Sequence, residues 1–162
     1  MSYTSANDQE KTLDALDTMV EAERAVAEYY RACSKAFSNN RKFWQELSKQ
    51  EISHADIIAQ MSRLVIKQGH TYSIGNAAPV VALKGFISKI HSDLDKVKSG
   101  QISETNALNI AYHIESTFVE QKFNKAIRTD SDEFKVVLDD IAVLEEKHKK
   151  LVHDKLKHMG KK

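Results

Sequence analysis

Apolar residues recur every three or four positions through most of this chain, which is the spacing of an α-helix that buries one face. Residues that interrupt helices are rare, because the sequence has only five glycines and one proline, Pro79. Proline suits the first turn of a helix, so a helix should begin there. The pattern predicts four long helices and one further helix, over about 8–38, 41–69, 103–128 and 132–159, and over 79–98. We therefore predict an all-α protein.

The connections between these helices predict how they are arranged. Short polar turns at 38–40 and 129–132 join the first long helix to the second and the third to the fourth, so each pair should form an antiparallel hairpin. The connection between the second and third long helices is too long for a hairpin loop and contains the helix over 79–98. We expect one domain, residues 1–162, built as a four-helix bundle with a helical crossover connection between bundle helices 2 and 3.

Each of the four long helices carries charged or imidazole residues at positions that its apolar stripe should bury. The second and fourth helices both contain the pattern Glu-x-x-His at such positions. Residues three apart in a helix project from one face and can therefore bind the same ion. One such pair occurs by chance on many solvated helices, whereas two in one helical chain form a specific pattern. The candidate residues are Glu23, Glu51, His54, Glu115, Glu145 and His148.

The hairpin turns should bring these residues to similar heights. Glu23 lies sixteen residues before Asn39, and His54 lies fourteen residues after Asn40. Glu115 and Glu145 are each fifteen residues from Asp130. Because a helix rises about 1.5 Å per residue, folding each hairpin back places its candidate residues nearly opposite one another.

Four carboxylates and two imidazoles are costly to bury without a counter-charge. Two divalent cations would supply about +4 against the −4 of the carboxylates, which is the arrangement of a dinuclear carboxylate site inside a helical bundle. Oxygen and imidazole ligands suit iron or manganese, and zinc would also bind. The alternative is a buried ion-pair or hydrogen-bond network without metal. We favour the metal site because all six positions carry the right ligand type.

Composition argues against several other classes of protein. The formal net charge of +1 argues against nucleic acid as the main partner. A single cysteine, Cys33, excludes an internal disulfide and any Cys-x-x-Cys metal site. The N-terminal residues are polar and lack a signal peptide pattern, and no apolar run approaches the length of a membrane span. These features predict a protein of the reducing cytoplasm.

The chain resembles the ferritin-like di-iron carboxylate superfamily, and most closely its rubrerythrin branch. The segment 141–148, Ile-Ala-Val-Leu-Glu-Glu-Lys-His, resembles the last-helix motif of rubrerythrins, and Glu23 followed seven residues later by Tyr30 resembles their first-helix pattern. The resemblance covers about residues 8–159, although only the ligand motifs are specific. It implies that Glu23 and Glu115 each bind as the single carboxylate of their helix. It also implies that Glu51 and Glu145 bridge or chelate the two ions, with His54 and His148 as nitrogen ligands.

Three departures from related proteins modify this expectation. Rubrerythrins carry a rubredoxin domain with four cysteines, which this sequence lacks, so we expect a separate electron-donor protein, rubredoxin-like in kind. Rubrerythrins also have an additional carboxylate one turn after the third-helix glutamate, where this chain has Phe118. Bacterioferritins place a haem-binding methionine directly after the second-helix glutamate, where this chain has Ile52, so no haem is implied.

The resemblance implies a di-iron oxidoreductase that binds two ferrous ions and reduces hydrogen peroxide or dioxygen. Tyr30 and Tyr112, the latter one turn from Glu115, are candidates for hydrogen bonding or electron transfer beside the site. A homodimer formed through an outer helix face is expected. Two alternatives come from other classes of function: an iron-handling or metal-sensing protein without turnover, and a metal-free helical interaction module.

Overall fold

The structure, a computed structural model, describes residues 4–67, 69–121 and 126–160. Helices make up most of this part of the chain, which confirms the all-α class. The helices are α1 (Ala6–Ala36), α2 (Arg41–Ile66), α3 (Ala78–Lys98), α4 (Glu104–Gln121) and α5 (Asp132–Met159). A short 3-10 helix, η1 (Ser38–Asn40), and two strands, β1 (Tyr72–Ile74) and β2 (Ile127–Thr129), complete the elements.

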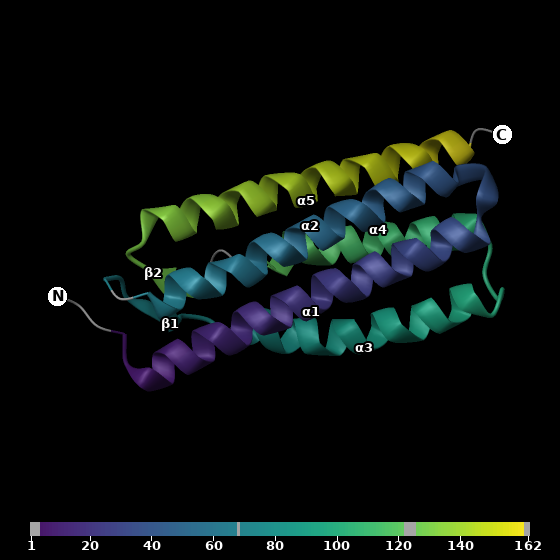
Figure 1. The fold of residues 1–162 in the computed structure, drawn as a ribbon. Helices are drawn as coiled ribbons and strands as arrows, with labels where there is room; N and C mark the ends of the chain where they lie inside the picture. The colour runs from purple at the N-terminus through teal and green to yellow at the C-terminus, as the bar shows by residue number, and fades with distance from the viewer. Residues whose placement is uncertain (1–3, 68, 122–125, 161–162) are drawn as a thin grey trace.

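The five helices lie roughly along one common direction (Figure 1). α1 and α2 form an antiparallel hairpin, and α3 packs along α1. α4 packs against α5, and further contacts join α2 to α5 and α1 to α4. Because α3 carries the chain back from one end of the molecule to the other, α2 and α4 run in the same direction (Figure 1).

Most helix ends lie close to their predicted positions, and side-chain caps explain two of the starts. Ser5 caps α1 by accepting a hydrogen bond from the backbone N–H of Asp8 at 3.1 Å. Ser131 caps α5 in the same way, at 3.2 Å from the backbone nitrogen of Phe134. Helix α2 ends at Ile66, before the predicted end at 69. At the starts of α1 and α5, the oxygen of the capping serine satisfies a backbone N–H that the helix itself leaves unpaired.

The predicted helix over 103–128 is wrong at its end, because Ile127–Thr129 form strand β2. This strand pairs antiparallel with β1, and Tyr72 lies opposite Thr129. The buried side chain of Ile127 fits a helical stripe and a strand equally well, so periodicity alone extended the helix. Residues 122–125, which the prediction also included, lie outside the described part of the chain.

The core runs between the helices and includes large aromatic side chains such as Trp44, Tyr30 and Phe134, each 0% exposed. Across the described residues, no helix is both long enough and apolar enough to span a membrane. Buried carboxylates and imidazoles interrupt this apolar interior.

Candidate metal centre

The structure brings all six candidate residues together inside the molecule. They project from four helices: one from α1, two from α2, one from α4 and two from α5. Their exposed fractions range from 0% to 6%, so water does not solvate their charges. Only a folded chain with these four helices side by side could place them in one cluster. The residues are Glu23, Glu51, His54, Glu115, Glu145 and His148.

Glu51 lies at the centre of the cluster, and each of its carboxylate oxygens faces one histidine. Its Oε1 lies 2.7 Å from Nδ1 of His148, within hydrogen-bonding distance. Its Oε2 lies 3.4 Å from Nδ1 of His54. The two imidazole rings stack on each other, with centroids 5.0 Å apart and planes inclined by 16°. Glu51 therefore joins the two Glu-x-x-His motifs.

A further carboxylate lies beyond each histidine. Nδ1 of His54 is 3.9 Å from Oε2 of Glu23, and Nδ1 of His148 is 3.9 Å from Oε2 of Glu115. Both distances are too long for hydrogen bonds. The cluster thus has two similar halves, one from the α1–α2 hairpin and one from the α4–α5 hairpin, that share Glu51.

Several buried polar atoms of the cluster have no hydrogen-bond partner among the described residues. They include Oε2 of Glu23, Oε2 of Glu51, Oε2 of Glu115 and Nδ1 of His54. A buried polar atom without a partner costs about 1–3 kcal/mol, so four in one place are a substantial penalty. A bound cation could satisfy such atoms.

Burial and the neighbouring charges also shift the pKa values of the four carboxyl groups in the cluster. Burial, and then repulsion by the charge of Glu51, raises the pKa of Glu23 and of Glu115 well above the ordinary value. The same two causes raise the pKa of Glu145 to about 8. Burial would also raise the pKa of Glu51, but the adjoining Glu23, His148 and His54 side chains outweigh burial and lower it. Ionisation of Glu23, Glu115 and Glu145 is therefore unfavourable unless a positive charge lies beside them.

The ligand atoms of Glu51, His54 and His148 all lie within 4.8 Å of one another, so this group could hold a metal ion. Carboxylate and imidazole together suit iron, manganese or zinc, and the set of donors does not select among them.

Tyr30 is directly connected to the cluster, because its hydroxyl donates a hydrogen bond of 2.5 Å to Oε1 of Glu115. The Tyr30 ring also lies against Trp44, with centroids 5.8 Å apart. Tyr112 is placed differently: its ring contacts His153, with centroids 5.6 Å apart, beside a shallow surface pocket. The described residues give Tyr112 no hydrogen bond to the cluster. Of the two tyrosines, the structure joins only Tyr30 to the site.

The structure also locates two positions at which the sequence differs from the families that it resembles. Phe118 is 2% exposed and packs edge-to-face on Phe86, with centroids 6.0 Å apart. An apolar contact therefore occupies the position where rubrerythrins have their additional carboxylate. Ile52 is 49% exposed and points away from the interior.

Sequence reasoning missed Ser48, which lies one turn before Glu51 and donates a hydrogen bond of 2.8 Å to the backbone carbonyl of Ala27. This bond joins α2 to α1 directly beside the cluster. A small polar residue at the edge of an apolar stripe was the only hint of it in the sequence.

Comparisons of the chain with protein-family models, with curated proteins and with solved structures found no match.

Proposed function

We propose that this chain is a dinuclear iron protein with a ferritin-like bundle, related to the rubrerythrin branch. In this proposal α1, α2, α4 and α5 are the bundle helices, and α3 is the crossover connection. The observation that carries the proposal is the burial of four carboxylates and two imidazoles in one cluster, with several of their polar atoms lacking partners. Two divalent cations would balance the charge and occupy those atoms.

The two halves of the cluster support a division of the ligands between two ions. One ion would be held by Glu23 and His54, and the other by Glu115 and His148. Glu51, whose two oxygens face the two histidines, would bridge them. Glu145 would bridge or chelate as the fourth carboxylate, and its raised pKa indicates that it gives up a proton when a cation binds.

The proposed activity is the reduction of hydrogen peroxide or dioxygen, in defence against oxidative stress or in iron oxidation. Two bound ferrous ions would supply the two electrons that, with two protons, reduce hydrogen peroxide to water or dioxygen to hydrogen peroxide. The chain's own contribution is to orient the ligands, to exclude water by its apolar surroundings and to hold Glu115 through Tyr30. We also propose a separate, rubredoxin-like protein as the source of electrons that returns the site to the ferrous state.

An anaerobic ferrous titration followed by stopped-flow mixing tests this proposal. Saturation near two irons per chain, with faster oxidation by peroxide than by dioxygen, is the expected result for a rubrerythrin-like protein. Faster oxidation by dioxygen would assign the site to ferritin-type iron oxidation. Absence of binding would overturn the proposal and favour the metal-free interaction module.

A second candidate, an iron-handling protein without turnover, is favoured by Phe118. The additional carboxylate of rubrerythrins takes part in ligand exchange linked to redox change, and a buried phenylalanine cannot do so. A single slow oxidation, with no steady state on addition of a reductant, would favour this candidate over the peroxidase.

Replacing Tyr30 with phenylalanine is expected to weaken binding of the ion assigned to Glu115 and His148 by about tenfold. An outer hydrogen bond that orients a metal ligand contributes about 10–100-fold to metal affinity. The loss would leave Oε1 of Glu115 without its donor. Ferrous affinity measured anaerobically checks the prediction. Tyr29→Phe is the matched control, since the Tyr29 hydroxyl donates to the backbone carbonyl of Ala107 at 2.9 Å. Equal losses of affinity in both variants would contradict a specific role for Tyr30.

A further inference from the structure

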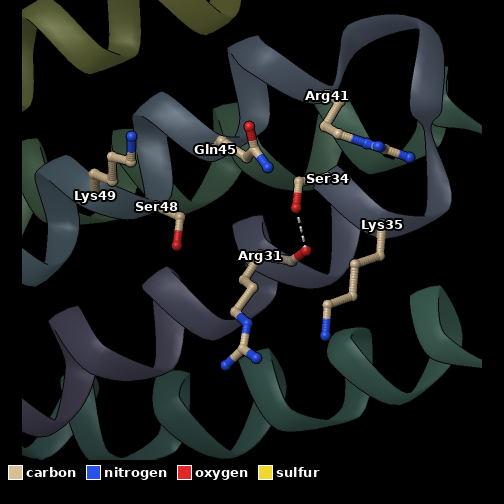
Figure 2. Close-up of a pocket in the computed structure, with 7 residues that line it drawn as sticks. All are labelled: Arg31, Ser34, Lys35, Arg41, Gln45, Ser48 and Lys49. Atoms are coloured by element: carbon tan, nitrogen blue, oxygen red, sulfur yellow. Dashed lines mark hydrogen bonds between the residues drawn. The ribbon is translucent and has the colours of Figure 1, made fainter.

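A pocket of about 540 Å³ lies between the last turns of α1 and the first turns of α2 (Figure 2). Small-molecule sites in proteins have volumes of about 300–1,000 Å³, so this pocket has the size of a binding site. None of the six cluster residues lines this pocket, so it is distinct from the buried carboxylate cluster.

Four cationic side chains line the pocket: Arg31 and Lys35 from α1, whose charged ends point toward α3, and Arg41 and Lys49 from α2 (Figure 2). None of the described residues that line it is acidic. Lys35, Arg41 and Lys49 form no ion pair with another described residue. Arg31 pairs only with Glu28, at 3.5 Å and with both side chains more than half exposed, and such a pair is weak. A chain with a net charge of +1 thus carries four uncompensated or weakly paired cationic residues around one pocket.

The floor of the pocket is polar and fixed. Ser34 and Ser48 are both buried, and their hydroxyls donate to the backbone carbonyls of Arg31 at 2.6 Å and of Ala27 at 2.8 Å. Their hydrogens are therefore used within the protein. The cationic side chains and the amide of Gln45, which also lines the pocket, are the donors left for a ligand.

The lining excludes several classes of ligand. The described lining residues include no aromatic and no large aliphatic side chain, so the pocket offers no aromatic ring on which a nucleobase could stack and no apolar surface for an acyl chain. A phosphate monoester carries a charge of about −1.5 to −2 at neutral pH, so four cations match two or three phosphate groups. Arginine and lysine are also the residues that bind phosphate oxygens best.

We propose that this pocket binds a small, multiply charged oxyanion of the oligophosphate class. The anion would join the C-terminal part of α1 to the N-terminal part of α2. The pocket includes Ser48, which lies one turn from Glu51, so an occupied pocket would fix the hairpin next to the carboxylate cluster. The site does not depend on the presence of metal.

Isothermal titration of the metal-free chain with inorganic triphosphate tests this site. The metal-free chain is used because triphosphate also chelates iron. One triphosphate per chain should bind, and affinity should fall as salt is raised. The double variant Arg41→Gln/Lys49→Gln is expected to weaken binding at least about tenfold, since each lost charge-assisted hydrogen bond is among the stronger polar contacts.

The control pair Lys84→Gln/Lys157→Gln removes the same charge from exposed positions that do not line this pocket, and it should change affinity by less than about twofold. Equal weakening in both pairs would overturn the proposal, because it would show only a diffuse effect of charge. Absence of measurable binding to the unaltered chain would overturn it as well. Vesicles that carry a phosphoinositide, titrated in parallel, distinguish a lipid headgroup from a free anion. Tighter binding of a single-stranded oligonucleotide than of triphosphate would identify the face as a nucleic-acid surface and reject the site.

Discussion

Replacing Glu51 with alanine is expected to remove tight binding of at least one of two ferrous ions, with a loss of affinity of at least about 100-fold. The two oxygens of Glu51 lie 2.7 Å and 3.4 Å from Nδ1 of His148 and His54, so one substitution removes a ligand from both halves of the cluster. Loss of an outer partner of a metal ligand already costs about 10–100-fold, and loss of the ligand itself should cost more. Anaerobic ferrous titration, with iron counted per chain, measures this effect.

The matched control is Glu146→Ala. Glu146 directly follows the buried Glu145 on α5 but is exposed, so its removal changes the net charge equally and leaves the cluster intact. Glu51→Gln provides a second test, because it keeps the shape of the side chain and removes only the charge. If Glu51→Ala and Glu51→Gln both fold, as judged by helical circular dichroism, and still bind two irons tightly, the ligand assignment is wrong.

The cluster could be located from sequence because each of its determinants is local. A helix repeats every 3.6 residues, so the sequence alone shows that Glu51 and His54 share a face. The rise per residue then sets the height of each residue above its hairpin turn. These two quantities sufficed to predict that Glu23 and His54 would meet, and the structure places them 3.9 Å apart.

The strand pair could not be predicted because its determinants are not local. Tyr72 and Thr129 pair although α3 and α4 lie between them in the sequence, and each strand has only three residues. A segment this short has no periodicity of its own, so only the distant partner selects a strand over another turn of helix. Directly after β1, the backbone N–H of Gly75 donates a hydrogen bond of 2.8 Å to the carbonyl of Ala126, which precedes β2.

The contrast between the two tyrosines shows where the helical pattern loses precision. Tyr112 lies three residues before Glu115, the same spacing as that of Glu51 and His54, yet its ring contacts His153. Tyr30 is 85 residues from Glu115 and reaches it from another helix. Sequence spacing therefore indicates which residues share a stripe, and only packing decides which side chains touch.

The metal-free chain is expected to lose stability as the pH rises from about 5 to 8, and saturating Mn²⁺ or Zn²⁺ should reverse this trend. Glu23, Glu115 and Glu145 have folded-state pKa values above their ordinary value, about 8 for Glu145. Their contribution to stability is complete below the unfolded-state pKa and is lost as the pH rises through the folded-state value. The pKa of Glu51 is lowered, so its contribution to stability changes only below about pH 5 and is constant between pH 5 and 8. Thermal unfolding at a series of pH values, with and without the ion, measures the trend.

Glu145→Gln isolates the contribution of one carboxyl, because it removes that titration and leaves the other cluster residues in place. The slope of unfolding free energy against pH measures the difference in bound protons between the folded and unfolded states. In this variant that difference should be smaller by up to about one proton. Metal should raise the unfolding temperature of the unaltered chain most at high pH, because the ion binds only the folded cluster and replaces its protons. Identical slopes in the variant and the unaltered chain, or a metal effect independent of pH, would contradict the assignment. Either result would show that these buried carboxyls do not exchange protons for a cation.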